Sequence, residues 1–220
     1  MAQKTRVDLI YETLRDRICL GVYQPGDTFH ESELGREFEV SRTPIRQALQ
    51  RLEYEKLASV RTGVGTIVEP FSVELADGYL ELRARMISAV SELGMISSDA
   101  DTDDLTMVLQ GRASRLSQST DPDHFWQVLK AVQDICLPLL ADDVLRHMES
   151  LLFFRSAPAL MTALLADPGA AAGRLQGTAN DLSAALNAGD PEAFFDVHSR
   201  SIRAYRDMLN DGTRQATAAP

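Results

Sequence analysis

Arginine, glutamine and threonine side chains recur on one face of the segment from Val40 to Leu52. In a helix over this segment, the polar face carries Thr43, Arg46, Gln47 and Gln50. The opposite face is apolar and consists of Ile45, Ala48, Leu49 and Leu52. Arginine and glutamine can make paired hydrogen bonds to base edges in the major groove of DNA. The segment therefore predicts a DNA-reading helix, with an ordinary amphipathic surface helix as the alternative.

The residues before this segment predict how the helix is positioned. Ser41 is a favoured N-cap type, and we expect its hydroxyl to accept a bond from a backbone N–H of the first turn. Apolar residues at helical spacing predict one helix over residues 5–20 and another from Glu31 to Phe38. Only three residues then precede the reading helix. Helix, tight turn and helix are the parts of a helix-turn-helix motif.

Two β-prone runs follow the reading helix. Residues 57–60 and 66–68 flank a turn that contains Gly63 and Gly65, which predicts a β-hairpin. Both glycines can adopt positive φ and allow close approach to a phosphate or groove wall. The hairpin would act as a wing that carries Arg61 and Thr62 to the DNA backbone or minor groove.

Residues 5–69 resemble the DNA-binding domain of the GntR family of bacterial transcription regulators. The motifs that carry the resemblance are Pro25-Gly26, the run from Ser41 to Leu49, and the run from Gly63 to Val68. The resemblance implies that arginines of the reading helix touch phosphates and bases, and that Thr62 and Gly63 lie at the wing tip. Ser32 stands where some members place a further DNA-contacting arginine. The complete set of expected DNA contacts is Ser41, Arg42, Thr43, Arg46, Gln47, Gln50, Arg61, Thr62 and Gly63.

The composition of the 220 residues is that of an ordinary soluble protein, 45% apolar and 25% charged. No uninterrupted apolar run is long enough to cross a membrane, and no apolar signal core follows the first basic residues, so we expect a cytoplasmic protein. Cys19 and Cys136 lie in helical patterns and are predicted to be buried thiols. The net charge of −10 is unevenly distributed, with −1 in residues 1–70 and −9 in residues 71–220. The acidity of residues 71–220 makes the N-terminal part the candidate for DNA contact.

Residues beyond Pro70 predict an all-α bundle of about six helices, so the fold class is mainly α. The expected helices span residues 73–94, 102–117, 122–140, 143–165, 168–186 and 191–209. Pro158 is expected to break or kink the fourth. The predicted domains are residues 1–70 for DNA binding and residues 71–212 for effector binding and dimerisation, with a disordered tail over 213–220. This order of parts resembles the FadR-like branch of the family with an FCD-type effector domain, and the helix count is nearer its VanR-type subset.

FCD-type domains commonly hold a divalent metal through one aspartate and three histidines, and this chain departs from that pattern. Trp126, Ala179 and Ser201 stand at the expected histidine positions. We therefore expect no metal cofactor. A displaced site built from Asp123, His124, His147 and His198 is the alternative to two surface histidines and a hydrogen-bonded wall histidine at position 198.

Three residues are the expected effector contacts in the bundle: Arg83, Trp126 and His198. Arg83 could fork onto a carboxylate ligand, or it could pair with a neighbouring acidic side chain. Trp126 could fill the space of the missing metal histidine with an aromatic surface.

These patterns predict a ligand-responsive regulator that acts as a repressor, binds a palindromic operator as a homodimer and responds to a small metabolite, with a carboxylate as the preferred class. The alternative is a constitutive DNA-binding protein with a degenerate effector domain. An enzyme is the third possibility, but the sequence contains no nucleophile elbow, phosphate loop or metalloprotease helix.

Overall fold

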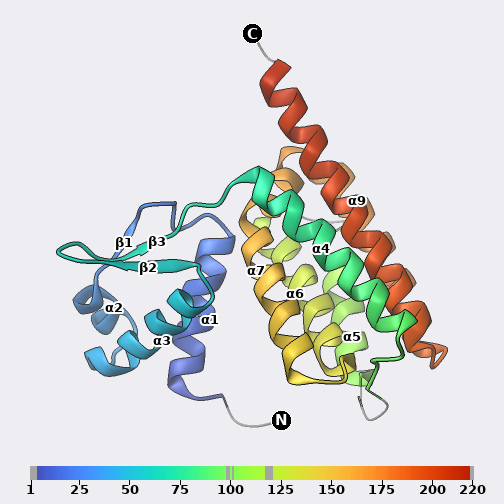
Figure 1. Cartoon of the computed structure of the whole chain (residues 1–220), viewed down its shortest axis with the longest axis horizontal. Coiled ribbons are helices and arrows are strands. Elements are labelled where there is room, and N and C mark those ends of the chain that lie inside the picture. Colours follow the sequence, from blue (N-terminus) through green and yellow to red (C-terminus); the bar gives the residue numbers. More distant parts are fainter. Residues whose placement is uncertain (1–3, 98–99, 101, 117–120, 219–220) are drawn as a thin grey trace. The chain divides into compact units, whose positions relative to one another are not determined.

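The computed structural model describes residues 4–97, 100, 102–116 and 121–218, with the backbone alone for 212–218. The chain forms two compact units, Met1–Phe71 and Ser72–Pro220 (Figure 1). The predicted fold class, a mainly helical chain with a small N-terminal sheet and a helical second part, is confirmed.

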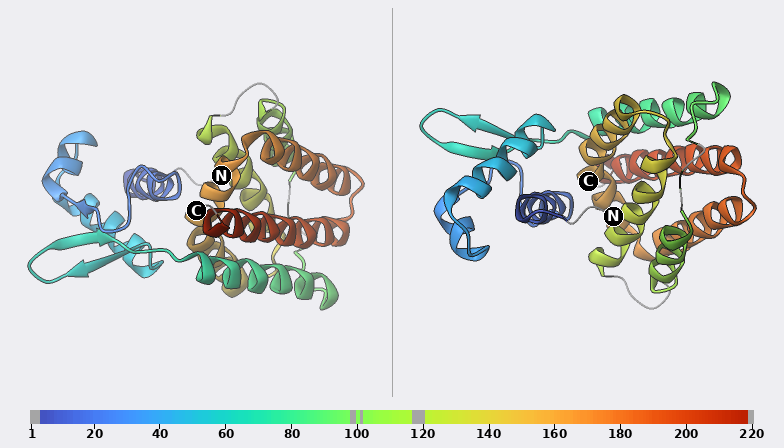
Figure 2. Two further views of the ribbon diagram at one scale, coloured as in Figure 1. Left: turned by 90° about the horizontal axis from the view of Figure 1, so that it is seen from above. Right: turned by 90° about the horizontal axis from the view of Figure 1, so that it is seen from below.

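The N-terminal unit is a winged helix-turn-helix. Its elements in chain order are α1 (Arg6–Cys19), β1 (Thr28–Phe29), α2 (Glu31–Glu37), α3 (Arg42–Tyr54), β2 (Ala58–Arg61) and β3 (Gly65–Val68) (Figures 1 and 2). The strands form an antiparallel sheet in the order β1-β3-β2. Arg61 pairs with Gly65 next to the turn that closes the β2–β3 hairpin. The predicted wing and the very short first strand are thus both present.

Helix α1 begins with a reciprocal cap. The Thr5 hydroxyl accepts a bond from the Asp8 backbone N–H, and the Asp8 carboxylate accepts one from the Thr5 N–H. The apolar face of α1 is buried, as its spacing predicts. Arg15 is also buried, although the sequence places it on the outer face, because its guanidinium lies over the Tyr11 ring and bonds to Asp16.

The turn between α2 and α3 depends on close backbone contact. A Cβ at Gly35 would lie 3.1 Å from the Val40 carbonyl oxygen, so a larger residue there would push the backbone of the turn by a few tenths of an ångström. Glu39 adopts positive φ, at 53°. Arg6 of α1 donates to the Phe38 carbonyl at 2.9 Å and thereby fixes the turn against the first helix. Helix α1 therefore helps, together with the turn itself, to hold α2 and α3 in place.

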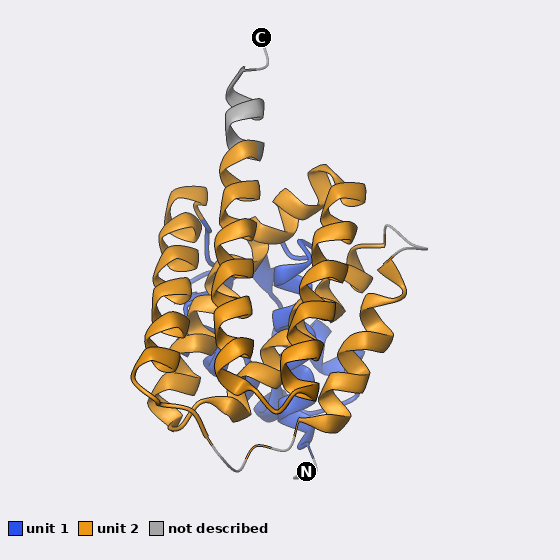
Figure 3. Ribbon diagram, turned by 90° about the vertical axis from the view of Figure 1, so that its right-hand side faces the viewer, with its two compact units in different colours: residues 1–71 blue, residues 72–220 orange. Residues whose placement is uncertain are grey.

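The second unit is an all-α bundle (Figure 3). Its described residues form α4 (Val73–Glu92), α5 (Asp103–Ala113), α6 (Pro122–Leu139), α7 (Asp143–Ala166), α8 (Pro168–Asn187) and α9 (Pro191–Ala218). Helix α4 packs against α7 and α9, and α5 packs against α6 and α8. Ser72 caps α4 through a bond from the Leu75 N–H. Both cysteines are buried and free, as predicted.

The structure differs from the sequence prediction at two places in the bundle helices. Of the break or kink expected at Pro158, the break is absent, because Pro158 and its neighbours are buried and packing on both sides holds helix α7 where one backbone bond is lost. Helix α9 continues to Ala218, past the expected end near Leu209. The predicted tail is therefore helical over residues 213–218, and residues 219–220 lie outside the described chain. One glycine at position 212 costs a helix only about 1 kcal/mol, so it does not by itself end the helix.

Helix α7 is the one helix of the described chain that is long and apolar enough to cross a membrane. In its most apolar stretch, 61% of the residues are buried inside the bundle. Its charged Glu149 is fully buried and paired with Arg83. This pattern is typical of the core helix of a bundle.

Candidate nucleic-acid interface and buried polar cluster

Helix α3 presents one polar and exposed face. Its apolar residues, Ile45, Ala48, Leu49 and Leu52, are at most 3% exposed and form the floor of the helix. The polar residues that the sequence singles out are all exposed: Ser41, Arg42, Thr43, Arg46, Gln47 and Gln50. One side of α3 is therefore free to enter a groove while the other is anchored in the domain core.

Ser41 occupies the N-cap position of α3, but its hydroxyl makes no capping bond. The predicted cap interaction is therefore wrong. The hydroxyl is exposed at the start of α3. There it remains available as a hydrogen-bond donor to an anionic oxygen.

The wing presents a second exposed group. Arg61 ends β2, and Thr62 and Gly63 form the exposed hairpin tip. Gly63 has a φ of 80° and Gly65 a φ of 121°, so both adopt the positive φ that the sequence predicts. A groove between the wing and the first turns of α2 and α3 is lined by Glu31, Ser32, Arg42, Val60, Gly65 and Thr66.

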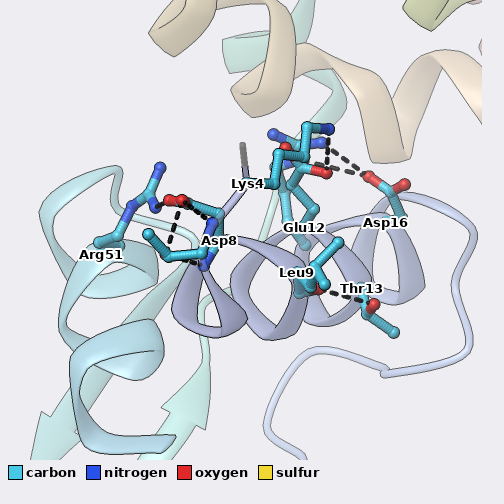
Figure 4. Close-up of polar contacts among 9 residues, drawn as sticks. Lys4, Asp8, Leu9, Glu12, Thr13, Asp16 and Arg51 are labelled. Carbon is cyan, nitrogen blue, oxygen red and sulfur yellow. Dashed lines mark hydrogen bonds and ion pairs between the residues drawn. The ribbon is translucent and has the colours of Figure 1, made fainter. Parts of the chain in front are cut away.

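The basic residues of the N-terminal unit differ in whether they are paired with other side chains. Arg51 binds Asp8 at 2.6 Å and lies 3.8 Å over the Tyr11 ring, so it joins α3 to α1 (Figure 4). Hydrogen bonds from Thr5 and then the Arg51 contact lower the pKa of Asp8 to about 2. Arg42 and Arg61 are exposed and have no protein partner in the described chain.

Arg46 lies at the exposed centre of α3 and is paired across the helix-turn-helix. Its Nε lies 2.9 Å from both carboxylate oxygens of Glu31, the first residue of α2. The hydrogen bond to Glu31 raises the pKa of Arg46. The sequence gives no partner for Arg46, because the two residues are 15 positions apart and meet only when α2 crosses α3.

A buried cluster of polar side chains lies inside the bundle. Arg83 of α4 is 3% exposed, and its Nε donates to Glu149 of α7 at 2.6 Å. Its Nη2 donates to the Gln133 side-chain oxygen at 3.0 Å and lies 3.3 Å from Nε2 of His198. Of the two predicted environments for Arg83, the pairing with an acidic side chain is the one observed.

Aromatic rings cover this cluster. The Trp126 and Phe153 rings are stacked 5.7 Å apart, and the Arg83 guanidinium lies 4.9 Å from the Phe153 ring centre. Arg83, Trp126 and His198, the three predicted effector contacts, therefore border one buried region. Glu149 and Gln133 were missed in the sequence. Glu149 could have been found as an acid four residues after Leu145 and three before Leu152, on the apolar face of α7.

Burial and the Arg83 charge shift the pKa values of the titratable groups in this cluster. Burial alone would raise the pKa of Glu149, but the adjacent Arg83 charge outweighs it and lowers that pKa. Burial lowers the pKa of His198, and burial raises that of the Cys136 thiol. The cluster at neutral pH is therefore a guanidinium–carboxylate pair beside a neutral imidazole.

The metal ligands considered in the sequence do not come together. His147 is exposed, and Asp123 lies at the exposed start of α6. The one group of possible ligands in the described residues is Cys136, Glu149 and His198, whose ligand atoms lie within 4.8 Å of one another. The Arg83 guanidinium already binds Glu149 and lies against His198, so a permanent cation fills the place of a metal ion. These residues do not fit a divalent metal, because two cations would share one carboxylate.

Buried polar atoms without a protein partner also line this region. In the described chain they include Trp126 Nε1, Gln133 Nε2, Glu149 Oε2 and His198 Nδ1. Unsatisfied buried polar atoms are rare in folded proteins, because each costs about 1–3 kcal/mol. Water or a polar ligand could satisfy them.

Comparisons with known proteins agree with this arrangement. Residues 7–68 match the family model of bacterial regulatory proteins, gntR family. The gluconate operon transcriptional repressor of Bacillus licheniformis is 34% identical over 98 residues, which cover 44% of this chain and 40% of that protein. The Uxu operon regulator of Haemophilus influenzae is 30% identical over 125 residues, 51% of this chain and 47% of that protein. The chain spans less than half the length of these curated relatives.

Two solved structures share the fold over nearly the whole chain. The putative transcriptional regulator GntR from Rhodococcus sp. RHA1 has a TM-score of 0.68 and 18% identity, and it covers 94% of this chain and 99% of that one. Escherichia coli McbR/YncC has a TM-score of 0.72 and 20% identity over 96% and 100% of the two chains. Residues 7–68 therefore match the GntR family of bacterial regulatory proteins, and the fold of the chain is shared with these two solved structures.

Proposed function

We propose that this protein is a ligand-responsive transcription regulator that binds a palindromic operator as a homodimer. The observation that carries the proposal is the exposed polar face of α3 beside a glycine-tipped wing, within residues that match a family of regulators. Helix α3 would enter the major groove, and Arg61, Thr62 and Gly63 would contact the backbone or minor groove. One of the named relatives is a gluconate operon transcriptional repressor, which supports repression as the mode of action. A regulator of this kind would act in the cytoplasm.

Replacing Arg46 with alanine tests this role. DNA sites enriched by in vitro selection with the full chain would serve as the operator. We expect Arg46→Ala to weaken specific binding by roughly 5- to 150-fold, the usual loss for an arginine that reads a base. Fluorescence anisotropy titrations at fixed salt measure the change. Arg200→Ala, which removes an exposed arginine from α9, is the matched control and should leave affinity within about twofold. Specific binding that is the same in both variants would contradict the proposal.

The dimer would use an exposed apolar stripe on α4. At spacings of three, four and seven residues, one flank of the helix and its C-cap carries Leu75, Tyr79, Leu82, Met86 and Leu93. The side chains of Leu75 and Leu82 are 53% and 50% exposed. The other flank is occupied, because Asp77 and Glu81 bind Arg206 of α9. The simplest partner for this stripe is the same stripe on a second copy of the chain, since a two-fold interface pairs one patch with itself.

The effector would bind in the buried polar cluster of residues 71–212, the region we assign to effector binding and dimerisation. Arg83 is already neutralised by Glu149, so a carboxylate would have to displace that buried acid. The free groups are the N–H donors of Trp126 Nε1 and Gln133 Nε2, the acceptor Glu149 Oε2, and His198 Nδ1, whose role depends on the tautomer. This set favours a polar ligand that is neutral or carries both charges over the simple carboxylate first expected. We place the domain in the FadR-like, FCD-type branch without its metal, nearer the VanR-type subset.

A thermal-shift screen separates this proposal from a constitutive regulator with a degenerate bundle. Trp126 is the single tryptophan, and it is buried in the bundle, so its fluorescence reports the unfolding of that unit. We expect at least one small polar metabolite, at a free concentration of about 100 times its Kd, to stabilise the bundle by about 2.7 kcal/mol. The same compound should change operator affinity. A library of polar metabolites that leaves the Trp126 transition unmoved would favour the constitutive alternative.

A further inference from the structure

The acid that holds Arg46 lies in an unexpected place. Glu31 is on the surface that would face DNA, in the groove that Arg46, Gln50 and Thr66 also line. Its side chain is 31% exposed, and that of Arg46 is 60% exposed. A carboxylate at this surface repels the phosphate backbone, so it lowers non-specific affinity for any duplex. The loss of non-specific affinity caused by Glu31 suggests that this carboxylate serves another purpose.

The geometry of the pair supplies that role. Glu31 takes only the Nε–H of Arg46, through both of its oxygens at 2.9 Å. The four N–H groups on the two Nη atoms have no protein acceptor in the described residues. A guanidinium that is anchored through Nε keeps its outer edge in one orientation, and that edge can donate two parallel bonds. The O6 and N7 atoms of guanine accept such a pair in the major groove.

We propose that Glu31 is a positioning residue that makes Arg46 a base reader rather than a phosphate contact. Anchoring removes rotamer freedom before binding, so less entropy is lost when the guanidinium meets a base. The Glu31 charge also penalises sites where Arg46 would only meet phosphate. Both effects raise the ratio of specific to non-specific affinity. The inference rests on the proposed DNA-binding function.

The test compares three substitutions in the full chain. Glu31→Ala removes the charge and the anchor, while Glu31→Gln removes the charge but keeps one acceptor. Glu33→Ala is the matched control, because Glu33 is exposed on the same helix and has no protein partner in the described residues. Affinities for the selected operator and for a scrambled duplex are measured across a series of salt concentrations.

We expect Glu31→Ala to lower the specific-to-non-specific ratio about tenfold, with tighter binding to the scrambled duplex. Glu31→Gln should keep more of the ratio than Glu31→Ala. Glu33→Ala should strengthen binding to both duplexes equally and leave the ratio unchanged. In an Arg46→Ala background, Glu31→Ala should no longer alter the ratio, because the residue that it positions is absent.

The outcomes separate this inference from the proposed function. If Arg46→Ala weakens operator binding but Glu31→Ala behaves as Glu33→Ala does, Glu31 has no positioning role while the regulator assignment stands. If Arg46→Ala leaves operator binding intact, both fail. A circular dichroism melt of each variant confirms that the winged domain remains folded at the assay temperature.

Discussion

Replacing Arg83 with methionine is expected to destabilise the helical bundle by about 3–5 kcal/mol, the usual cost of leaving one member of a buried ion pair without its partner. Arg83 and Glu149 are 3% and 0% exposed, so water cannot replace the lost contact. Gln133 would also lose the donor that satisfies its side-chain oxygen. Urea unfolding at pH 7, followed by Trp126 fluorescence, measures the bundle separately from the winged domain.

The double variant Arg83→Met/Glu149→Met distinguishes a lost pair from lost packing. We expect it to recover most of the stability, because well-packed apolar side chains often replace a buried ion pair at little cost. Arg85→Met is the control, since Arg85 lies on the same helix with a side chain 73% exposed, and it should cost less than about 0.5 kcal/mol. A single variant at position 83 that is no less stable than the control would show that the pair is not needed by the bundle.

Local spacing predicts much of the N-terminal unit. Helix periodicity predicts which residues of α3 face the domain core, and turn chemistry predicts where the wing has glycines. Both signals are encoded within a few positions of the sequence. The same holds for the helices of the bundle, whose apolar faces repeat at three and four residues. The predicted hydrogen bond of the Ser41 cap was wrong, although it too was a local prediction. A favoured residue type at the N-cap does not ensure that its hydroxyl bonds to the first turn.

Polar partners could not be predicted in this way. Arg83 and Glu149 lie 66 positions apart, and their contact exists only because α4 packs on α7. The sequence reduces Arg83 to two environments but contains no local signal that selects one. The Arg51 contact with Asp8, at a separation of 43 positions, has the same origin. The sequence therefore shows which arginine and lysine side chains are candidates for contact with DNA. Tertiary packing decides which of them are already paired with an acidic side chain.

Placing a charge in the α4 stripe is expected to have the largest effect on operator binding. In a two-fold interface, Leu82→Glu brings two carboxylates into one apolar contact, where each lacks a partner. We expect the protein to become monomeric in sedimentation velocity experiments at micromolar concentration. Operator affinity should then fall by about 10²- to 10⁴-fold, because the second winged domain no longer binds at the high effective concentration that the dimer supplies.

A single half-site distinguishes this loss from damage to the DNA-reading surface. Leu82 lies in the bundle, so Leu82→Glu should bind an isolated half-site as the wild type does, while the affinity for the full palindrome approaches the half-site value. Met107→Glu, at a residue of α5 that is 64% exposed, introduces the same charge elsewhere on the bundle and should remain dimeric. A Leu82→Glu protein that stays dimeric and keeps full palindrome affinity would place the interface away from α4. Equal losses on half-site and palindrome would instead show that the substitution damages the DNA-reading surface itself.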